Sequence, residues 1–76
     1  MATIRALHNY DILWTRDGLD IKSDAEATEY CKQEMLKDGN IEWCYYWRDE
    51  NDHHPLAIHR DIVFHGYEYY ERKHNI

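Results

Sequence analysis

The sequence predicts a small α+β fold in which one helix packs on one face of an antiparallel sheet of about three to five strands. Three observations lead to this prediction: a turn signal at Asp17-Gly18, a helix-start pattern at Ser23 and an alternating aromatic segment over 41–48. The expected order of elements is β-β-α-β-β. With 76 residues and no repeat or linker, the chain is expected to form a single domain over 1–76.

The first element is expected to be a hairpin with Asp17-Gly18 at its tip, because this dipeptide suits a two-residue turn that needs positive φ. Pairing about this tip places four apolar residues on one face, which we expect to pack in the core. These residues are Ile12, Trp14, Leu19 and Ile21. Ile4 and Ala6 continue the same parity upstream, so the first strand is expected to be long or bulged.

A helix is expected over about 24–38. Ser23 and Glu26 form a capping-box pattern at its start, and Gly39 is a typical residue just after a helix end. The face expected to pack on the sheet carries residues spaced by four, namely Ala27, Cys31 and Met35.

Residues 41–48 alternate as a strand does, and their aromatic content predicts a place near the centre of the sheet. One side, expected to face the core, carries Ile41, Trp43, Tyr45 and Trp47. The other side carries Glu42, Cys44, Tyr46 and Arg48. Tyr46 is therefore expected to be exposed.

The segment 49–55 is polar and ends in a proline, so it is expected to be a loop. Two short strands are preferred over 56–59 and 62–65, because isoleucine, valine and phenylalanine favour strands. The alternative is a short helix that follows Pro55 and stops at Gly66. Residues 67–73 are expected to be a last strand or an ordered extension.

The charge of the chain indicates which partners it can have. Nine lysines and arginines face fifteen aspartates and glutamates, giving a net charge of −6, which disfavours direct binding of nucleic acid or of an anionic membrane. No apolar run approaches the roughly 18 residues of a membrane span. Cys31 and Cys44 form no CxxC motif and are expected to be free buried thiols, which favours a reducing, cytoplasmic location.

Signals for catalysis are weak, and no catalytic residue or cofactor is expected. The strongest alternative is a metal-dependent hydrolase in which His53, His54 and His59 converge on Zn²⁺ or Ni²⁺. Adjacent histidines point apart in an extended chain, however, so solvated or structural histidines are the preferred interpretation.

Binding to another protein is the preferred function. Seven tyrosines, three tryptophans and one phenylalanine exceed what one sheet face can bury under one helix, so some rings should form a recognition surface. Carboxylates of the 49–55 loop, with a second acidic group at the corner between hairpin and helix, could stand where the phosphates of a nucleic acid would lie. The residues expected to contact a partner are Tyr46, Asp49, Glu50, Asp52, Tyr67, Tyr69 and Tyr70.

We therefore expect a non-enzymatic protein, monomeric or dimeric, that covers a basic surface of a larger protein partner, including a surface that itself binds nucleic acid. The alternative from another class is an accessory subunit or homodimeric module. Small size, acidic charge and surplus aromatic residues together resemble small phage-encoded inhibitors of host nucleic-acid machinery, including anti-CRISPR proteins. The resemblance is one of composition and implies an inhibitor, with no residue carried over.

Overall fold

The computed structural model describes residues 1–75, which form one sheet and three helices. Its elements are β1 (Ala2–His8), β2 (Asp11–Leu19), α1 (Asp24–Lys37), β3 (Trp43–Trp47), β4 (Leu56–His59), α2 (Arg60–His65) and α3 (Tyr67–His74). The strands form an antiparallel sheet in the order β2-β1-β3-β4, so β3 is an inner strand, as predicted. The predicted α+β class is confirmed.

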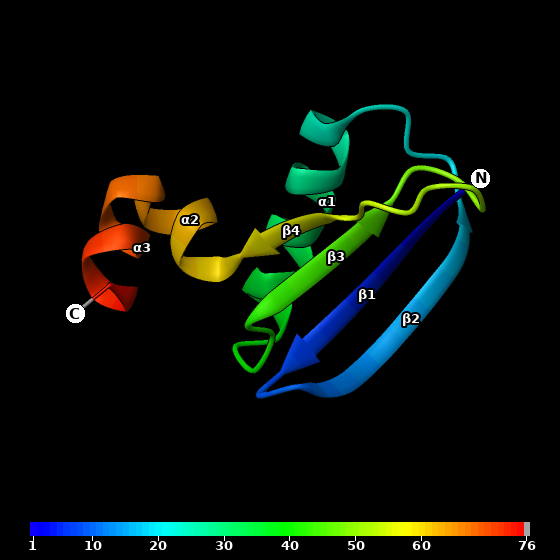
Figure 1. Cartoon of the computed structure of the whole chain (residues 1–76). Helices are drawn as coiled ribbons and strands as arrows, with labels where there is room; N and C mark the ends of the chain where they lie inside the picture. The colour runs from blue at the N-terminus through cyan, green and yellow to red at the C-terminus, as the bar shows by residue number, and fades with distance from the viewer. Residues whose placement is uncertain (76) are drawn as a thin grey trace.

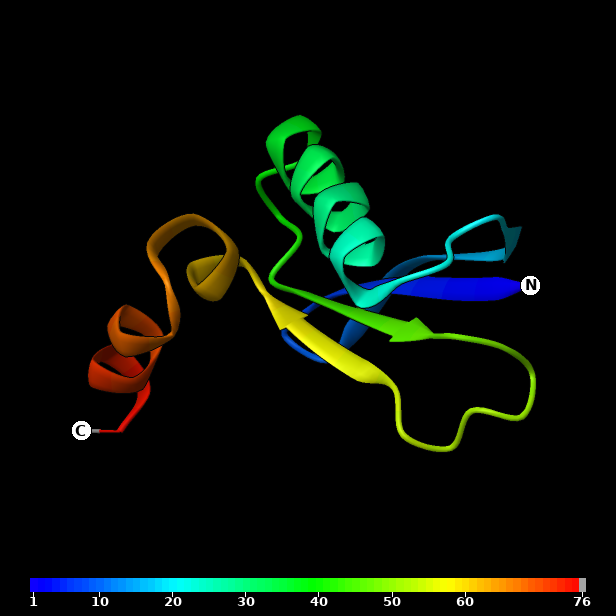
Figure 2. The same ribbon diagram turned by 90° about the horizontal axis from the view of Figure 1, so that it is seen from above.

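The sheet has one covered face and one open face. Helix α1 lies behind the sheet in the view of Figure 1, and Figure 2 shows it from above on that side alone. Helices α2 and α3 continue past the end of β4, which makes the molecule elongated, with extents of 37 × 20 × 20 Å. Among residues 1–75, no helix covers the opposite face of the sheet along most of β1 and β2.

The hairpin turns at Asn9-Tyr10, so the prediction that Asp17-Gly18 forms its tip is wrong. The φ angles of Asn9 and Tyr10 are 48° and 71°, positive at both positions as a type I′ turn requires, and His8 pairs with Asp11 on either side. Asp17-Gly18 instead lies inside β2.

There the dipeptide forms a β-bulge. Strand β2 carries one residue more than β1 between the pairs Ala2–Leu19 and Ile4–Arg16. Gly18 has a φ of 69°, which a bulge of this kind accommodates. The sequence signal for positive φ is thus correct, but the positive φ bends a strand instead of reversing the chain.

A second bulge changes the face on which Ile12 lies. One extra residue, Leu13, stands between the residues that pair with Ala6 and Leu7. Since side chains alternate along a strand, this insertion moves Ile12 to the open face, where it is 57% exposed, and its predicted place in the core is wrong. The other residues of the predicted core face are half-buried against the core: Trp14, Leu19 and Ile21.

Helix α1 matches its prediction closely. The Ser23 hydroxyl oxygen accepts the backbone N–H of Glu26 at 3.1 Å, and Asp38 caps the other end. The face that packs on the sheet carries the buried residues that the spacing predicted: Ala27, Cys31 and Met35.

Below α1, the core is built from one side of the inner strands. Ile4 pairs with Tyr46 and Ala6 with Cys44, so these four side chains share the covered face and are buried. Tyr46 is 1% exposed, and the prediction that it is exposed is wrong. Cys31 and Cys44 are buried free thiols, as expected.

The chain after β4 is helical. The predicted strand over 56–59 is confirmed, but the one over 62–65 is wrong, because Nδ1 of His59 accepts the backbone N–H of Asp61 at 3.0 Å and caps a helix. Gly66, with a φ of 90°, separates α2 from α3, and residues 67–73 belong to α3. Within residues 1–75, no helix combines the length and apolarity needed to cross a membrane.

Candidate functional site on the open face of the sheet

Three aromatic residues form a row on the open face. Trp43, Tyr45 and Trp47 alternate along β3 with the buried residues of that strand, so all three point away from α1 and are half-buried. The rings of Trp43 and Tyr45 are nearly parallel, with 4° between their planes and 6.0 Å between their centroids. The ring centroids of Tyr45 and Trp47 lie 6.2 Å apart. We call these three residues the aromatic row.

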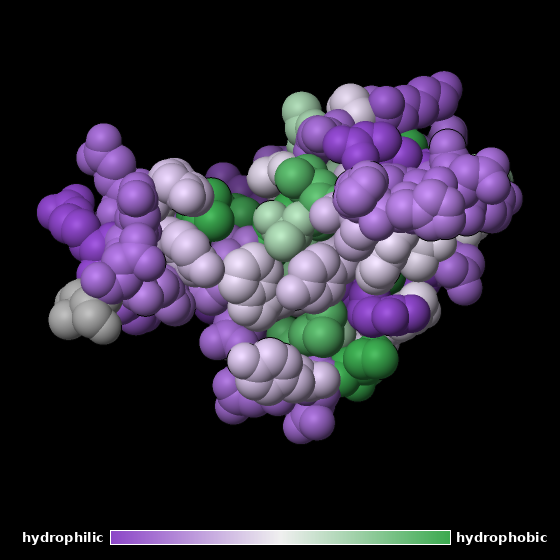
Figure 3. Space-filling view, viewed as in Figure 1, coloured by the Kyte–Doolittle hydropathy of each residue, from purple (hydrophilic) through white to green (hydrophobic). Residues whose placement is uncertain are grey.

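Strand β1 flanks the row with polar and apolar side chains. Arg5, which pairs with Tyr45, places its guanidinium carbon 5.2 Å from the ring centroid of Trp47. Such a contact between a cation and an aromatic face is attractive. In Figure 3, which views the open face, near-white aromatic and green apolar atoms meet across the middle of the sheet, while hydrophilic atoms gather at both ends, over α3 and over the end that carries the N-terminus.

Two acidic segments of the sequence come together at the end of the molecule that carries the N-terminus. Residues 17–26 and 48–54 meet there, because the guanidinium of Arg48 lies 2.9 Å from Oδ2 of Asp24 and 3.2 Å from Oδ2 of Asp52. Seven carboxylates share the two segments with two basic side chains, Lys22 and Arg48, a difference of −5 within the net charge of −6. We call this region the acidic end. Its carboxylates are Asp17, Asp20, Asp24, Glu26, Asp49, Glu50 and Asp52.

The acidic end adjoins the aromatic row. Trp47, the last residue of the row, is followed directly by Arg48 and the loop. Thr3, which pairs with Trp47, donates its hydroxyl hydrogen to Oδ1 of Asp17 at 2.8 Å. Aromatic rings and carboxylates therefore lie side by side at this end of the open face.

Asp52 has a structural role within the acidic end. Its carboxylate accepts the backbone N–H groups of Arg48 and His54, at 3.0 and 2.9 Å. These two hydrogen bonds, together with the Arg48 guanidinium, hold the pKa of Asp52 below its usual value, so the carboxylate stays ionised. The exposed carboxylates of the loop are those of Asp49 and Glu50.

The other predicted contact residues lie elsewhere. Tyr46 is in the core, and α3 places Tyr67 and Tyr69 at the opposite end of the molecule from the acidic loop, 62% and 39% exposed. Tyr70 is half-buried and stacks on His74 with 4.3 Å between the ring centroids. The predicted tyrosines and carboxylates thus do not form one surface, and the aromatic row, which was expected to be core, takes the place of the tyrosines beside the carboxylates.

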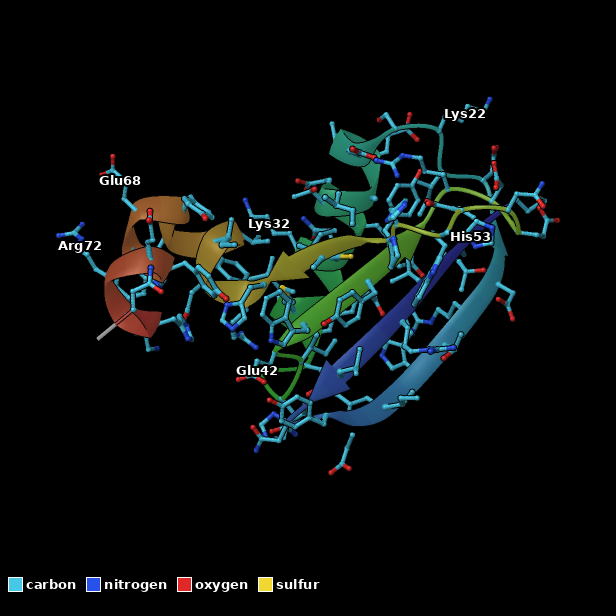
Figure 4. All side chains as sticks on the ribbon, in the orientation of Figure 1. Lys22, Lys32, Glu42, His53, Glu68 and Arg72 are labelled. Carbon is cyan, nitrogen blue, oxygen red and sulfur yellow. The ribbon has the colours of Figure 1, made fainter. Side chains whose placement is uncertain are left out.

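The predicted histidine cluster does not form. His53 and His54 lie in the loop before β4, whereas His59 ends that strand, and Figure 4 shows His53 at the acidic end. His59 instead meets Asp61 and His74, and one ligand atom from each of these three lies within 4.8 Å of the others.

Contacts already formed by these three side chains favour a structural role over metal binding. Oδ2 of Asp61 lies 3.3 Å from Nζ of Lys73 and 3.4 Å from Nε2 of His74. Burial alone raises the pKa of Asp61, but the hydrogen bonds from His74 and Lys73 outweigh it and lower the pKa. Oδ2 of Asp61 is thus already engaged by Lys73 and His74, and the Nδ1 lone pair of His59 is already used to cap α2. The cluster holds α3 against the end of β4.

Comparison of the chain with protein-family models, with curated proteins and with solved structures finds no match. The fold and the surface define an α+β protein with an aromatic open face and an acidic end, and the functional assignment depends on that geometry.

Proposed function

We propose that the protein is a non-enzymatic binding protein that covers a basic surface of a larger protein partner with the open face of its sheet. The observation that carries this proposal is the junction of the aromatic row with the acidic end at Trp47. Tryptophan and tyrosine anchor many protein interfaces, and flanking charges of one sign select partners of the other.

A protein partner fits this surface better than a nucleic acid does. Exposed rings on a sheet can stack on the bases of single strands, but such proteins add a positively charged groove that follows the phosphates. Here Arg5 stands beside the Trp47 ring. Asp17 accepts a hydrogen bond from Thr3, which pairs with Trp47, and the exposed Asp49 and Glu50 follow in the loop just after β3. The net −5 of the acidic end repels a phosphate backbone and attracts lysine and arginine.

Inhibition is the proposed consequence of binding. A basic surface that carries nucleic acid loses access to phosphates once carboxylates occupy it, so the protein would act as a mimic of nucleic acid, as inhibitors of the phage-encoded kind do. Support for this finer proposal comes from the concentration of charge, since Asp20, Asp49 and Glu50 are exposed at one end of an elongated molecule.

Affinity purification from an extract of the source organism, with mass spectrometry and reassembly from purified components, tests the proposal. The double variant Asp20→Lys/Glu50→Lys reverses two exposed carboxylates of the acidic end without touching Asp52, which holds the loop. The matched control, Glu68→Lys/Glu71→Lys, makes the same charge change on exposed positions of α3.

We expect the unmodified protein and the α3 control to bind a partner with a basic surface, and the acidic-end variant to lose it. Binding should weaken at high salt, because screening reduces the attraction between exposed charges. Equal loss in both double variants, affinity that is independent of salt, or capture of nucleic acid in place of a protein would overturn the proposal.

A further inference from the structure

A pocket of about 250 Å³ opens at the end of the aromatic row that lies away from the acidic end. Trp43 and Tyr45 form one wall, Leu7 and Tyr10 come from the β1–β2 hairpin, and His74 comes from α3. Figure 4 shows Glu42, the carboxylate of the pocket, at the start of β3 and far from His53. Drug-sized ligands occupy pockets of about 300 Å³ or more, so this pocket suits a single side chain.

Hydrogen bonds fix the backbone of Glu42 in the pocket lining. Its backbone N–H donates to the carbonyl of Leu7 at 2.9 Å, and its carbonyl accepts the N–H of Arg60 at 3.0 Å. The backbone N–H of Asn9 donates to Oε1 of the Glu42 carboxylate at 3.4 Å. Within residues 1–75, no lysine or arginine lies within ion-pair distance of this carboxylate. A half-buried negative charge is thus left without a cationic partner.

The walls favour a cation as well. Indole and phenol faces attract a cation through their quadrupole, and both Trp43 and Tyr45, whose rings are nearly parallel, line the pocket. His59, also in the lining, packs edge-on against Trp43 at 4.6 Å, and burial lowers its pKa, so it adds no positive charge at neutral pH. An anionic group would face Glu42 at close range, and a purely apolar group would desolvate that carboxylate without compensation.

Tyr10 stands at the rim in a backbone conformation that its side chain disfavours. Its φ of 71° lies in the left-handed region, where a type I′ turn prefers glycine, and its side chain is 97% exposed. Neither burial nor turn geometry explains a tyrosine at this position. Tyr10 belongs to the lining of the pocket, so contact with a bound group would give this exposed ring a role.

We propose that this pocket binds one lysine or arginine side chain of the basic partner, with the aliphatic stem against Leu7 and Tyr45 and the charged head between Trp43 and Glu42. The inference deepens the proposed function and rests on it for the identity of the partner. The pocket itself can be tested without a partner.

Titration of ¹⁵N-labelled protein with Nα-acetyl-L-arginine amide and Nα-acetyl-L-lysine amide, followed by NMR, tests the pocket. The neutral isostere Nα-acetyl-L-citrulline amide is the reference. We expect saturable shifts of the Trp43 indole N–H and the Glu42 amide with a cationic probe, and weaker shifts with citrulline. Glu42→Gln should weaken binding of the cationic probes by about threefold, the size expected for a partly exposed charge pair, whereas Glu68→Gln, the same change at an exposed position of α3, should leave it unchanged.

Tyr10→Gly separates a binding role from a structural one. The substitution relaxes the turn, so we expect a higher melting temperature together with weaker binding of the cationic probes. The pocket assignment would be overturned if the citrulline derivative caused chemical shift changes as large as those of the cationic probes, or if Glu42→Gln left the affinity for the cationic probes unchanged. If the partner is captured in a way that depends on the acidic end, but none of the probes binds, the pocket assignment is wrong and the proposed function stands. If the cationic probes bind, but the variant Asp20→Lys/Glu50→Lys captures the partner as well as the unmodified protein does, the proposed function is wrong and the pocket assignment stands.

Discussion

The guanidinium of Arg48 lies 2.9 Å from the carboxylate of Asp24, which joins the loop after β3 to the first turn of α1. The two residues are 24 positions apart in the sequence. Because Arg48 also contacts Asp52, one cation holds together two acidic segments that otherwise repel each other. The acidic end is therefore an arrangement that depends on tertiary structure.

The first prediction concerns this bridge. Arg48→Ala removes the cation and leaves the carboxylates facing each other, so the free energy of unfolding should decrease by a small amount. This loss of unfolding free energy should be smaller in about 1 M salt, where the screening length is about 3 Å. Urea unfolding at low and high salt measures it, with Arg72→Ala on α3 as the control of equal charge. A deficit that does not depend on salt would contradict an electrostatic role.

Adjacent tyrosines on opposite faces give the second prediction. Tyr46→Ala opens a cavity in the core and should lower the free energy of unfolding by about 3–5 kcal/mol, in the range of large aromatic truncations. Tyr45→Ala removes a half-buried ring of the aromatic row and should cost clearly less stability while weakening partner binding. Chemical denaturation of both variants compares them. If Tyr45→Ala is the more destabilising, the assignment of faces is wrong.

The buried thiols give the third prediction. Burial shields both thiols from a labelling reagent, and a hydrogen bond with Cys44, together with burial, also raises the pKa of the Cys31 thiol, which suppresses its reactive thiolate. The same hydrogen bond lowers the pKa of Cys44, so burial alone protects that thiol. Ellman's reagent should therefore react with the native protein at least about a hundredfold more slowly than with the protein in urea. Rapid labelling of either thiol under native conditions would show that the space between α1 and β3 is open.

The fourth prediction is a loss of stability on mild acidification. Burial lowers the pKa of His59 from its ordinary 6.5; His74 and Lys73 act in the same direction, and Asp61 and Glu42 oppose them. The folded protein therefore prefers neutral His59, so this contribution is present above pH 6.5 and is lost as the pH falls below it. The free energy of unfolding should decrease between about pH 7 and pH 5.

His59→Asn isolates that contribution, because asparagine keeps an oxygen that can cap α2 but does not titrate. The free energy of unfolding of His59→Asn should change less with pH than that of the unmodified protein, whatever the absolute stability of the variant. His54→Asn, in the exposed loop, is the control. If the two variants have the same slope as the unmodified protein, His59 is not the group that titrates.

Local signals in the sequence predicted the elements better than the faces. Ser23 and the spacing of Cys31 and Met35 identify α1 because capping and helical periodicity depend on neighbouring residues alone. Asp17-Gly18 signals positive φ but does not distinguish a turn from a bulge. Asn9-Tyr10 gave little signal, because a tyrosine at positive φ is uncommon.

The residues of β3 alone favoured the wrong face, because the side with three aromatic rings is the open one and the side with a single ring, Tyr46, is buried. The small side chains offered a clue: Ala6 and Cys44 pair across strands and leave room for α1 to approach closely. A strand was preferred to the alternative helix over 62–65 because histidine is an unusual cap, and His59 acts as one only where β4 ends. These choices depend on tertiary packing, which moved the aromatic row to the surface and Tyr46 to the core.

The affinity of the purified partner for two single variants tests the central claim most directly. Trp47→Ser removes the ring at the junction of the aromatic row and the acidic end, and Tyr67→Ser removes an exposed ring at the far end of the molecule. By isothermal titration calorimetry, Trp47→Ser should raise the dissociation constant at least about tenfold, as loss of an interface anchor does, while Tyr67→Ser leaves it nearly unchanged. The reverse pattern would place the binding surface on α3 and contradict the proposed role of the open face.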